Sequence, residues 1–178
     1  MDRPDYDEAL RRSGVMNTLA EFDPRLAGTL PLGLDLPLSD LDILCHAADH
    51  GAFAAVLWAA FRNASSFSLR QQIAGDRPVI ASFNAHGWPF QVFGQARPVN
   101  EQDGWRHFLI ERRLLELGGQ RFRAAVRRER QRGVKTEPAF AAALRLEGDP
   151  FFALLDLERR DDTSLIPLPA RAGFGVLG

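Results

Sequence analysis

The stretch GTLPLGLDLPLSDLDILC, residues Gly28–Cys45, decides the fold of this 178-residue chain. It begins with a Gly-Thr pair, passes through a loop, and ends in the segment 39–45, SDLDILC, which we expect to be a β-strand. Side chains alternate across a strand, so Asp40 and Asp42 would share one face, and the apolar residues between and after them the other. Two carboxylates on one face of a strand are suited to bind a divalent cation such as Mg²⁺.

The composition is that of an ordinary globular domain. Apolar residues make up 46% of the chain and charged residues 25%, and 178 residues are enough for one domain with a hydrophobic core. The net charge is −1, so the molecule as a whole is not an electrostatic binder of nucleic acid or membrane. Any such binding would need a local basic patch.

The single cysteine, Cys45, lies in an apolar strand and excludes a disulfide within the chain. The first twelve residues have no apolar run typical of a signal peptide, and no apolar stretch reaches the roughly 20 residues of a spanning helix. We therefore expect a cytoplasmic protein that does not interact with membranes.

The N-terminal half predicts a sheet with flanking helices. Residues 5–20 have helical spacing, with a break at Gly14. A strand at Arg25–Leu32 would be antiparallel to 39–45, and a helix at Ala52–Ala60 would be buried on all sides. A strand is expected at Ser65–Ile73, with Phe67, Leu69 and Ile73 inward. A hairpin of Pro78–Phe83 and Pro89–Gly94 completes the set. These give a sheet of four to five strands.

The C-terminal half predicts helices. We expect a helix at 101–118 that a Gly-Gly pair ends, and a second helix at 120–132. A third helix would follow an N-cap at Thr136, and a fourth would span 151–157. The last twenty residues would form an extended tail. The predicted architecture is α+β, with a mixed sheet of four to five strands and flanking helices. Residues 1–98 would be the α/β core, 99–157 a helical region packed on it, and 158–178 an extended tail.

The context of the two carboxylates favours a phosphate ligand. A Gly-Thr pair about a dozen residues upstream places small residues next to them. Backbone N–H groups at Gly28, with the hydroxyl of Thr29 or Ser39, are suited to hold a phosphate that a metal bridges. Phosphoryl transfer needs this arrangement, because the metal neutralises charge and the donors position the phosphates. The alternative is a solvent-facing strand with two acids that bind nothing.

The Gly-Thr pair followed by SDLDI resembles the signature of the polymerase-beta-type nucleotidyltransferase superfamily. The fuller set of segments resembles still more closely an uncharacterised bacterial family with a nucleotidyltransferase-like core. These segments are residues 28–45, FQVFGQARPV, the Arg106-His107 helix, KTEPAFA and GDPF. The resemblance spans most of residues 26–152 and implies a nucleotidyltransferase-like fold, a bound nucleoside triphosphate and Mg²⁺.

The superfamily also implies a third carboxylate on a later strand. Alternation in the 89–94 strand places Gln91 on the face where this acid is expected, and an amide cannot offset the charge of a second divalent cation. Glu101, Asp103 or Glu137 from the helical half are alternatives for the missing acid. The resemblance therefore implies Asp40, Asp42 and Gln91 as the catalytic positions, with Asp40 and Asp42 as metal ligands.

The basic residues gather after the glycine pair. They are Arg121, Arg123, Arg127, Arg128, Arg130, Arg132 and Lys135. A solvated helix face is the simpler interpretation, and binding of phosphate or nucleic acid is the alternative. Lys135 precedes a helix start, where its ammonium and free N–H groups are suited to face a triphosphate. His107 and Glu111 lie one helical turn apart and are suited to share a hydrogen bond or a metal.

The predicted function is binding of a nucleoside triphosphate with Mg²⁺ and transfer of its nucleotidyl group to an acceptor. The acceptor can be a small molecule, a protein or an RNA. The nucleotide-binding residues would be Gly28, Thr29, Ser39 and Lys135. The alternative is a catalytically inactive protein of the same fold that acts as a binding or regulatory module, and Gln91 is the residue that favours it.

Overall fold

The computed structural model describes residues 4–174, which form two compact units. The first unit comprises the described part of Met1–Leu30 together with Ser39–Trp105. The second comprises Pro31–Leu38 and the described part of Arg106–Gly178. The loop between the Gly-Thr pair and the acidic strand therefore belongs to the second unit, although both of its neighbours in sequence belong to the first.

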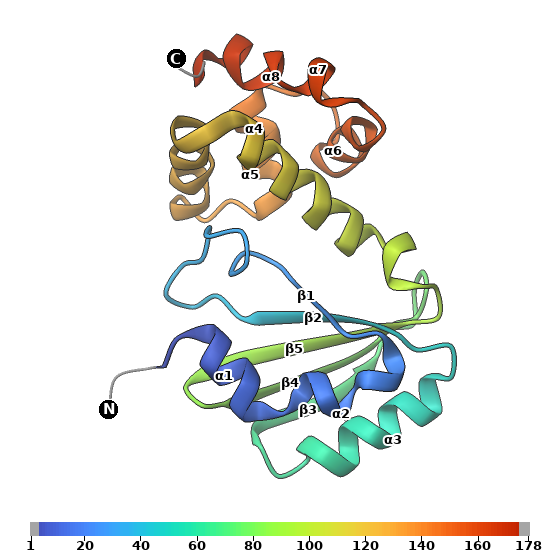
Figure 1. Ribbon diagram of the computed structural model, residues 1–178. Helices are drawn as coiled ribbons and strands as arrows, with labels where there is room; N and C mark the ends of the chain where they lie inside the picture. Colours follow the sequence, from blue (N-terminus) through green and yellow to red (C-terminus); the bar gives the residue numbers. More distant parts are fainter. Residues whose placement is uncertain (1–3, 175–178) are drawn as a thin grey trace. The chain divides into compact units, whose positions relative to one another are not determined.

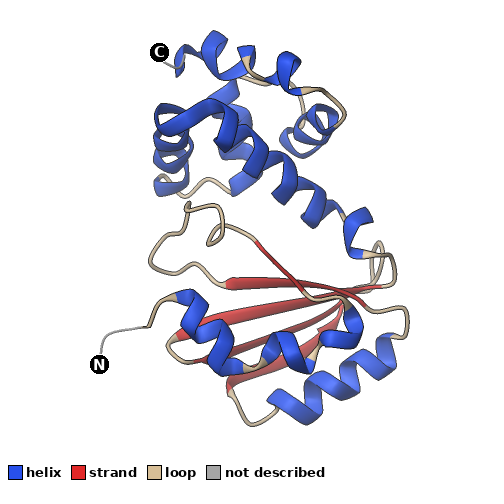
Figure 2. Ribbon diagram, in the orientation of Figure 1, coloured by secondary structure: helices blue, strands red, loops and turns tan. Residues whose placement is uncertain are grey.

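The first unit is built on a five-stranded mixed sheet with the strand order β1-β2-β5-β4-β3 (Figure 2). Its strands are β1 Arg25–Ala27, β2 Leu41–His46, β3 Ser65–Gln71, β4 Val79–Ala85 and β5 Trp88–Gln95. β2 is parallel to β5, and the β1–β2, β4–β5 and β3–β4 pairs are antiparallel. The acidic strand β2 thus lies beside the second strand of the hairpin, which is far from it in sequence.

One face of this sheet is covered by helices (Figure 1). The elements there are α1 Tyr6–Ser13, α2 Val15–Thr18, the short 3₁₀ turn η1 Ala20–Phe22, and α3 His50–Phe61. Leu41, Ile43 and Cys45 of β2 join Phe90 and Val92 of β5 in the core that these elements enclose. Because alternate residues point to opposite faces, Asp42 and Gln91 lie on the other face.

Local chemistry sets the helix ends. The Asp5 side chain accepts a hydrogen bond from the backbone N–H of Glu8 at 2.7 Å, which caps the start of α1. Gly14 ends that helix in the left-handed conformation and begins α2, which confirms the predicted break. The side chain of Asp49 caps α3 by accepting from the N–H of Ala52 at 2.9 Å.

Three expectations for this unit were wrong. The first strand ends at Ala27 and does not reach Leu32, because Gly28 has φ of 76° and leaves the extended conformation. The α3 helix is not buried all round, since only Phe53, Leu57 and Phe61 are buried along one stripe. Ile73 lies beyond the end of β3 and is 92% exposed, so it does not face the core.

The second unit is helical. Its elements are α4 Asp103–Gln131, α5 Thr136–Leu144, α6 Pro150–Glu158, α7 Asp162–Leu165, α8 Pro167–Pro169 and the π-helix η3 Ala170–Phe174, with the 3₁₀ turn η2 Val99–Glu101 just before α4. Gly119 has non-helical dihedrals inside α4 and kinks it where the Gly-Gly pair predicted the end of a helix.

Two helical ends differ from the expectation. Lys135, not Thr136, occupies the N-cap position of α5, and its side chain makes no capping hydrogen bond. The last twenty residues were expected to be extended, but 162–165 and 167–174 are helical. Asp161 caps the start of the first of these helices, because its side chain accepts a hydrogen bond from the backbone N–H of Ser164 at 2.9 Å. The final residues 175–178 of the predicted tail lie outside the described residues.

Side-chain bonds fasten these C-terminal helices to α4. Arg106 donates to the Glu158 carboxylate, with its Nη2 at 2.7 Å from Oε2, and Arg113 donates to Asp162 through Nε at 2.6 Å. No helix in the described residues 4–174 is long and apolar enough to cross a membrane.

Candidate nucleotide and metal site

The backbone of Gly28 lies against the carboxylate of Asp42. A Cβ atom added at Gly28 would stand 2.2 Å from Oδ2 of Asp42, well inside van der Waals contact. The register explains the approach, because Asp42 pairs with Ala27, the residue just before Gly28, across the β1–β2 ladder. The left-handed φ of Gly28 and this close approach both require glycine. The Gly-Thr pair and the D-x-D strand therefore form one structural unit.

Thr29 and Ser39 are also brought together. Both are 8% exposed, and the Thr29 hydroxyl lies 3.3 Å from the Ser39 hydroxyl. This bond joins the residue after Gly28 to the residue before Asp40, so it closes the base of the loop that separates them. The hydroxyl pair thus connects the residue that follows Gly28 to the segment that leads into β2 and Asp42.

Gln91 stands next to Asp42 in the sheet. The two residues are paired in the parallel β2–β5 register, so their side chains share one face of the sheet and their backbones lie about 5 Å apart. The alternation predicted for the 89–94 strand is confirmed, since Phe90 and Val92 are in the core and Gln91 is not. An amide thus occupies the position beside Asp42.

Asp40 lies directly before β2, which begins at Leu41, two residues later than the sequence predicted. It is half-buried, as is Asp42. The described residues contain no group of three or more His, Cys, Asp or Glu side chains placed to hold a metal ion. Asp42 and Gln91 are paired in the β2–β5 ladder, and Asp40 lies two residues before Asp42 in the chain.

The sequence interpretation missed Ser82. In the β4–β5 ladder Ser82 is directly opposite Gln91, and its side chain shares the face of Gln91 and Asp42. Alternation within 79–85, where Val79, Ala81 and Phe83 belong to the core, was the signal that could have identified it.

The loop between Gly28 and Asp42 is held inside the second unit. Leu32 and Leu34 are buried, and the Arg123 guanidinium donates to the backbone carbonyl of Leu32. A Cβ at Gly33 would stand 3.2 Å from Nη1 of Arg123, so this turn fits closely around the arginine. One arginine of the basic cluster therefore has a structural role.

Other members of the basic cluster are also bonded. Arg130 donates to the carbonyl of Val134 at 3.1 Å, and Arg132 pairs with Glu129 at 3.2 Å. The remaining arginines, 121, 127 and 128, are exposed. Lys135 is exposed at the start of α5 in the second unit, whereas Asp40, Asp42 and Gln91 belong to the first.

His107 and Glu111 are buried in the second unit but do not form the shared site that their spacing suggested. The His107 ring donates through Nε2 to the carbonyl of Phe151 at 3.0 Å. Oε1 of Glu111 has no hydrogen-bond partner among the described residues. Burial raises the pKa of the Glu111 carboxyl well above its usual range, and the charge of Glu137 adds to this effect while that of Arg130 opposes it.

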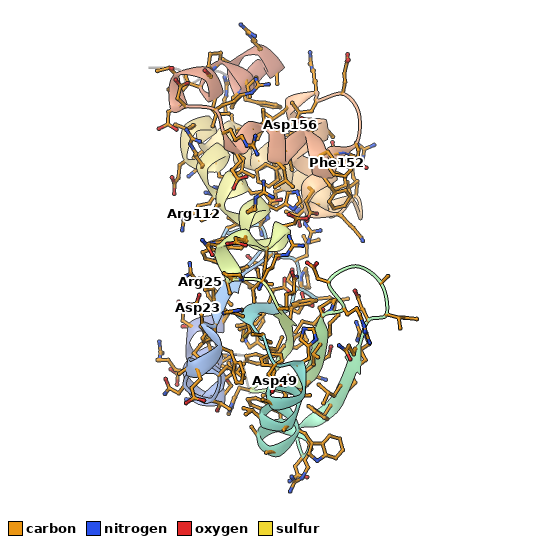
Figure 3. All side chains as sticks on the ribbon, turned by 90° about the vertical axis from the view of Figure 1, so that its right-hand side faces the viewer. Asp23, Arg25, Asp49, Arg112, Phe152 and Asp156 are labelled. Carbon is orange, nitrogen blue, oxygen red and sulfur yellow. The ribbon has the colours of Figure 1, made fainter. Side chains whose placement is uncertain are left out.

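Charged and aromatic side chains meet at the start of β1. Arg25 pairs with Asp23 at 3.0 Å (Figure 3). The guanidinium carbon of Arg25 lies 5.2 Å from the ring centre of Trp105. These contacts occupy the cation of Arg25 and hold the start of β1, the strand that leads into Gly28.

A family model described as a domain of unknown function, DUF4269, matches residues 8–157. The chain belongs to this family. The DUF4269 match covers the sheet, the Gly28–Asp42 contact and most of the helical unit. Among curated proteins, no match was found.

Solved structures show the same fold as this DUF4269 chain. A structure of the GLD-2/RNP-8 complex matches with a TM-score of 0.53 at 12% identity, covering 79% of this chain and 58% of that one. The Cid1 poly(U) polymerase, solved with MgGTP bound, matches with a TM-score of 0.52 at 14% identity, covering 71% and 40%. A cytoplasmic RNA terminal U-transferase matches with a TM-score of 0.50 at 14% identity, covering 83% and 42%.

The DUF4269 chain spans about two fifths to three fifths of the length of these neighbours. At such identities the likeness shows the fold alone. The fold is nucleotidyltransferase-like, a mixed α+β arrangement with a five-stranded sheet and flanking helices.

Proposed function

We propose that this protein binds a nucleoside triphosphate together with Mg²⁺ and transfers the nucleotidyl group to an acceptor. The observation that carries the proposal is the contact between Gly28 and Asp42, where a Cβ would stand 2.2 Å from the carboxylate. Only glycine permits this approach, which keeps a proposed metal-binding carboxylate beside the backbone of the Gly-Thr pair. The nucleotidyltransferase-like fold supports the same ligand.

Each site residue has a defined task in this proposal. Asp40 and Asp42 would hold the cation, which neutralises phosphate charge as the bond at the α-phosphorus changes. The backbone at Gly28 would position the phosphates, and the bonded pair Thr29 and Ser39 would keep that turn in place. Lys135, with the free N–H groups at the start of α5, is a separate candidate for phosphate binding within the helical unit.

Calorimetry with a non-hydrolysable triphosphate tests the binding. We expect binding only when Mg²⁺ is present, and at least a tenfold loss of affinity in Asp42→Asn, because the neutral amide gives up one anionic ligand. Asp76→Asn is the matched control, since Asp76 is an exposed carboxylate that pairs with Arg97 in the same unit. Equal binding by the Asp42→Asn variant would contradict the proposal.

The alternative function is a catalytically inactive module that keeps the fold for binding or regulation. The pairing of Gln91 with Asp42 favours it, because an amide stands where a carboxylate would otherwise complete the acidic group. Assays of triphosphate turnover separate the two functions. Turnover by the unmodified protein that Asp42→Asn abolishes supports the enzyme, whereas turnover only after Gln91→Glu supports the inactive module.

Two of the structural neighbours are a poly(U) polymerase and an RNA terminal U-transferase. An RNA acceptor is therefore one candidate here, alongside a small molecule and a protein. The exposed arginines 121, 127 and 128 would support RNA binding, which would fall steeply with salt concentration. We assign the activity to the cytoplasm, which the single buried cysteine favours.

A further inference from the structure

A neutral polar row crosses the sheet next to Asp42, on the face opposite the core that α1–α3 cover. Asp42 pairs with Gln91, Gln91 pairs with Ser82, and Ser82 pairs with Ser68. Neighbouring strands lie about 5 Å apart, so the three side chains after Asp42 extend the site by about 15 Å along this row. None of the three carries a charge.

The amide of Gln91 changes what the site can do to an attacking group. A carboxylate in this position would accept a proton from an acceptor hydroxyl, as a general base does, and an amide at neutral pH does not. Asp40 and Asp42 are committed to the cation in the proposed function. The row therefore offers no side chain that removes a proton from an acceptor bound along it.

The same amide changes which acceptor can approach. A third carboxylate would repel an anionic acceptor, whereas the NH₂ group of Gln91 and the hydroxyl of Ser82 both donate hydrogen bonds. Arg70 follows Ser68 by two residues on β3, so it shares this face, and its guanidinium is exposed. Two neutral donors and a nearby cation favour an anionic oxygen.

We propose that the acceptor attacks through an oxygen that is already anionic at neutral pH, a phosphate or a carboxylate, and that Gln91 and Ser82 bind it. This inference rests on the proposed function. The oxyanion attacks the α-phosphorus, a new P–O bond forms, and the bond between the α-phosphorus and the α–β bridging oxygen breaks. Pyrophosphate leaves with that electron pair, and no proton has to be removed from the acceptor.

Product analysis with small acceptors tests the inference. The full chain is incubated with ATP, Mg²⁺ and methyl phosphate, acetate or glycerol, and ³¹P NMR identifies the products. We expect a methyl ester of ADP or an acetyl adenylate, formed at least tenfold faster than the glycerol phosphodiester. The methyl phosphate and acetate arms distinguish the two sources of the oxyanion. Faster transfer to glycerol would overturn the inference.

Two variants test the roles of the row. Ser82→Ala is expected to raise KM for the anionic acceptor several-fold while Mg²⁺-dependent triphosphate affinity stays unchanged. Gln91→Glu is expected to weaken binding of methyl phosphate to the complex with a non-hydrolysable triphosphate, measured by calorimetry, and to shift transfer toward glycerol. Unchanged acceptor binding in both variants would overturn the inference.

The inference and the proposed function can fail separately. If the protein binds the triphosphate with Mg²⁺ but transfers to neither anion, the inference is wrong and the binding function stands. If Mg²⁺-dependent triphosphate binding is itself absent, both are wrong.

Discussion

Gly28 lies against Asp42 in a way that no larger residue can reproduce. We predict that Gly28→Ala displaces the Asp42 carboxylate, because the added Cβ would stand 2.2 Å from its Oδ2 atom. The left-handed backbone adds strain, on the order of 1–3 kcal/mol. The variant should lose Mg²⁺-dependent triphosphate binding by at least tenfold in calorimetry and unfold at a lower urea concentration.

Gly75→Ala separates the two causes. Gly75 also has a positive φ, 61°, but a Cβ there would meet no heavy atom within 4 Å. This variant should show the loss of stability that the strained backbone causes and keep full triphosphate binding. Similar binding by the two variants would contradict a role for the Gly28–Asp42 contact in the site.

Cys45 is a buried core residue of β2, and we predict that it is chemically inert in the folded protein. Burial, with a smaller effect from the charge of Asp23, raises the pKa of its thiol to about 12. The thiolate is the reactive form, so very little of it is present at pH 8. A thiol reagent such as Ellman's reagent should modify Cys45 at least a hundredfold more slowly in the native protein than in urea. Equal rates would show that β2 opens readily.

Elements with strong local signals could be predicted from the sequence. Gly14 divides the first two helices because glycine adopts the left-handed conformation there, and Gly119 kinks α4 for the same reason. The alternation in β5 placed Gln91 on the face opposite Phe90 and Val92. These predictions depended on residues whose effect is local and does not require knowledge of neighbours in space.

Elements decided by tertiary contacts could not be predicted. The α3 helix has no charged residue between Gly51 and Phe61, so its sequence does not distinguish its buried stripe from its exposed side. The approach of Gly28 to Asp42 and the row to Ser82 depend on strand register, which sequence alone left open. The helical turns at 162–174 follow a proline-rich sequence whose composition resembles a loop.

Glu111 makes the stability of α4 depend on pH. Its pKa in the folded protein is raised by burial, so above about pH 4.3 the unfolded chain ionises this carboxyl while the folded chain keeps it protonated. The folded state then binds more protons, and the free energy of unfolding falls as pH rises toward the folded pKa. We predict that Glu111→Gln removes this loss and stabilises the protein at pH 8 by about 1–3 kcal/mol.

Urea denaturation of both proteins between pH 4 and pH 8 measures this effect. The stability difference should grow with pH and be small at pH 4. Glu116→Gln is the control, because Glu116 is an exposed carboxylate on the same helix. A Glu111→Gln variant that is less stable than the unmodified protein at pH 8 would show that the ionised carboxylate has a stabilising partner.

At the scale of the whole molecule, the chain crosses between its two units at the loop that separates Gly28 from Asp42. Gly28 and Asp42 belong to the first unit, while Pro31–Leu38 between them belongs to the second. Because Leu32 and Leu34 are buried and the Leu32 carbonyl accepts from Arg123, this loop depends on the helical residues for its structure. The family match, residues 8–157, includes this loop and most of the helical residues.

We therefore predict that removing residues 106–178 frees the loop at Pro31–Leu38. In a chain that ends at Trp105, all five strands remain, but Leu32 and Leu34 lose the residues that bury them. Limited proteolysis with thermolysin, followed by mass spectrometry, should cut within 31–38 at least tenfold faster than in the full chain. The loop between β3 and β4, at 72–78, is the internal control, because it belongs to the first unit and should be cut at similar rates in both chains. Equal protection of 31–38 in both chains would show that the helical residues are not needed to order this loop.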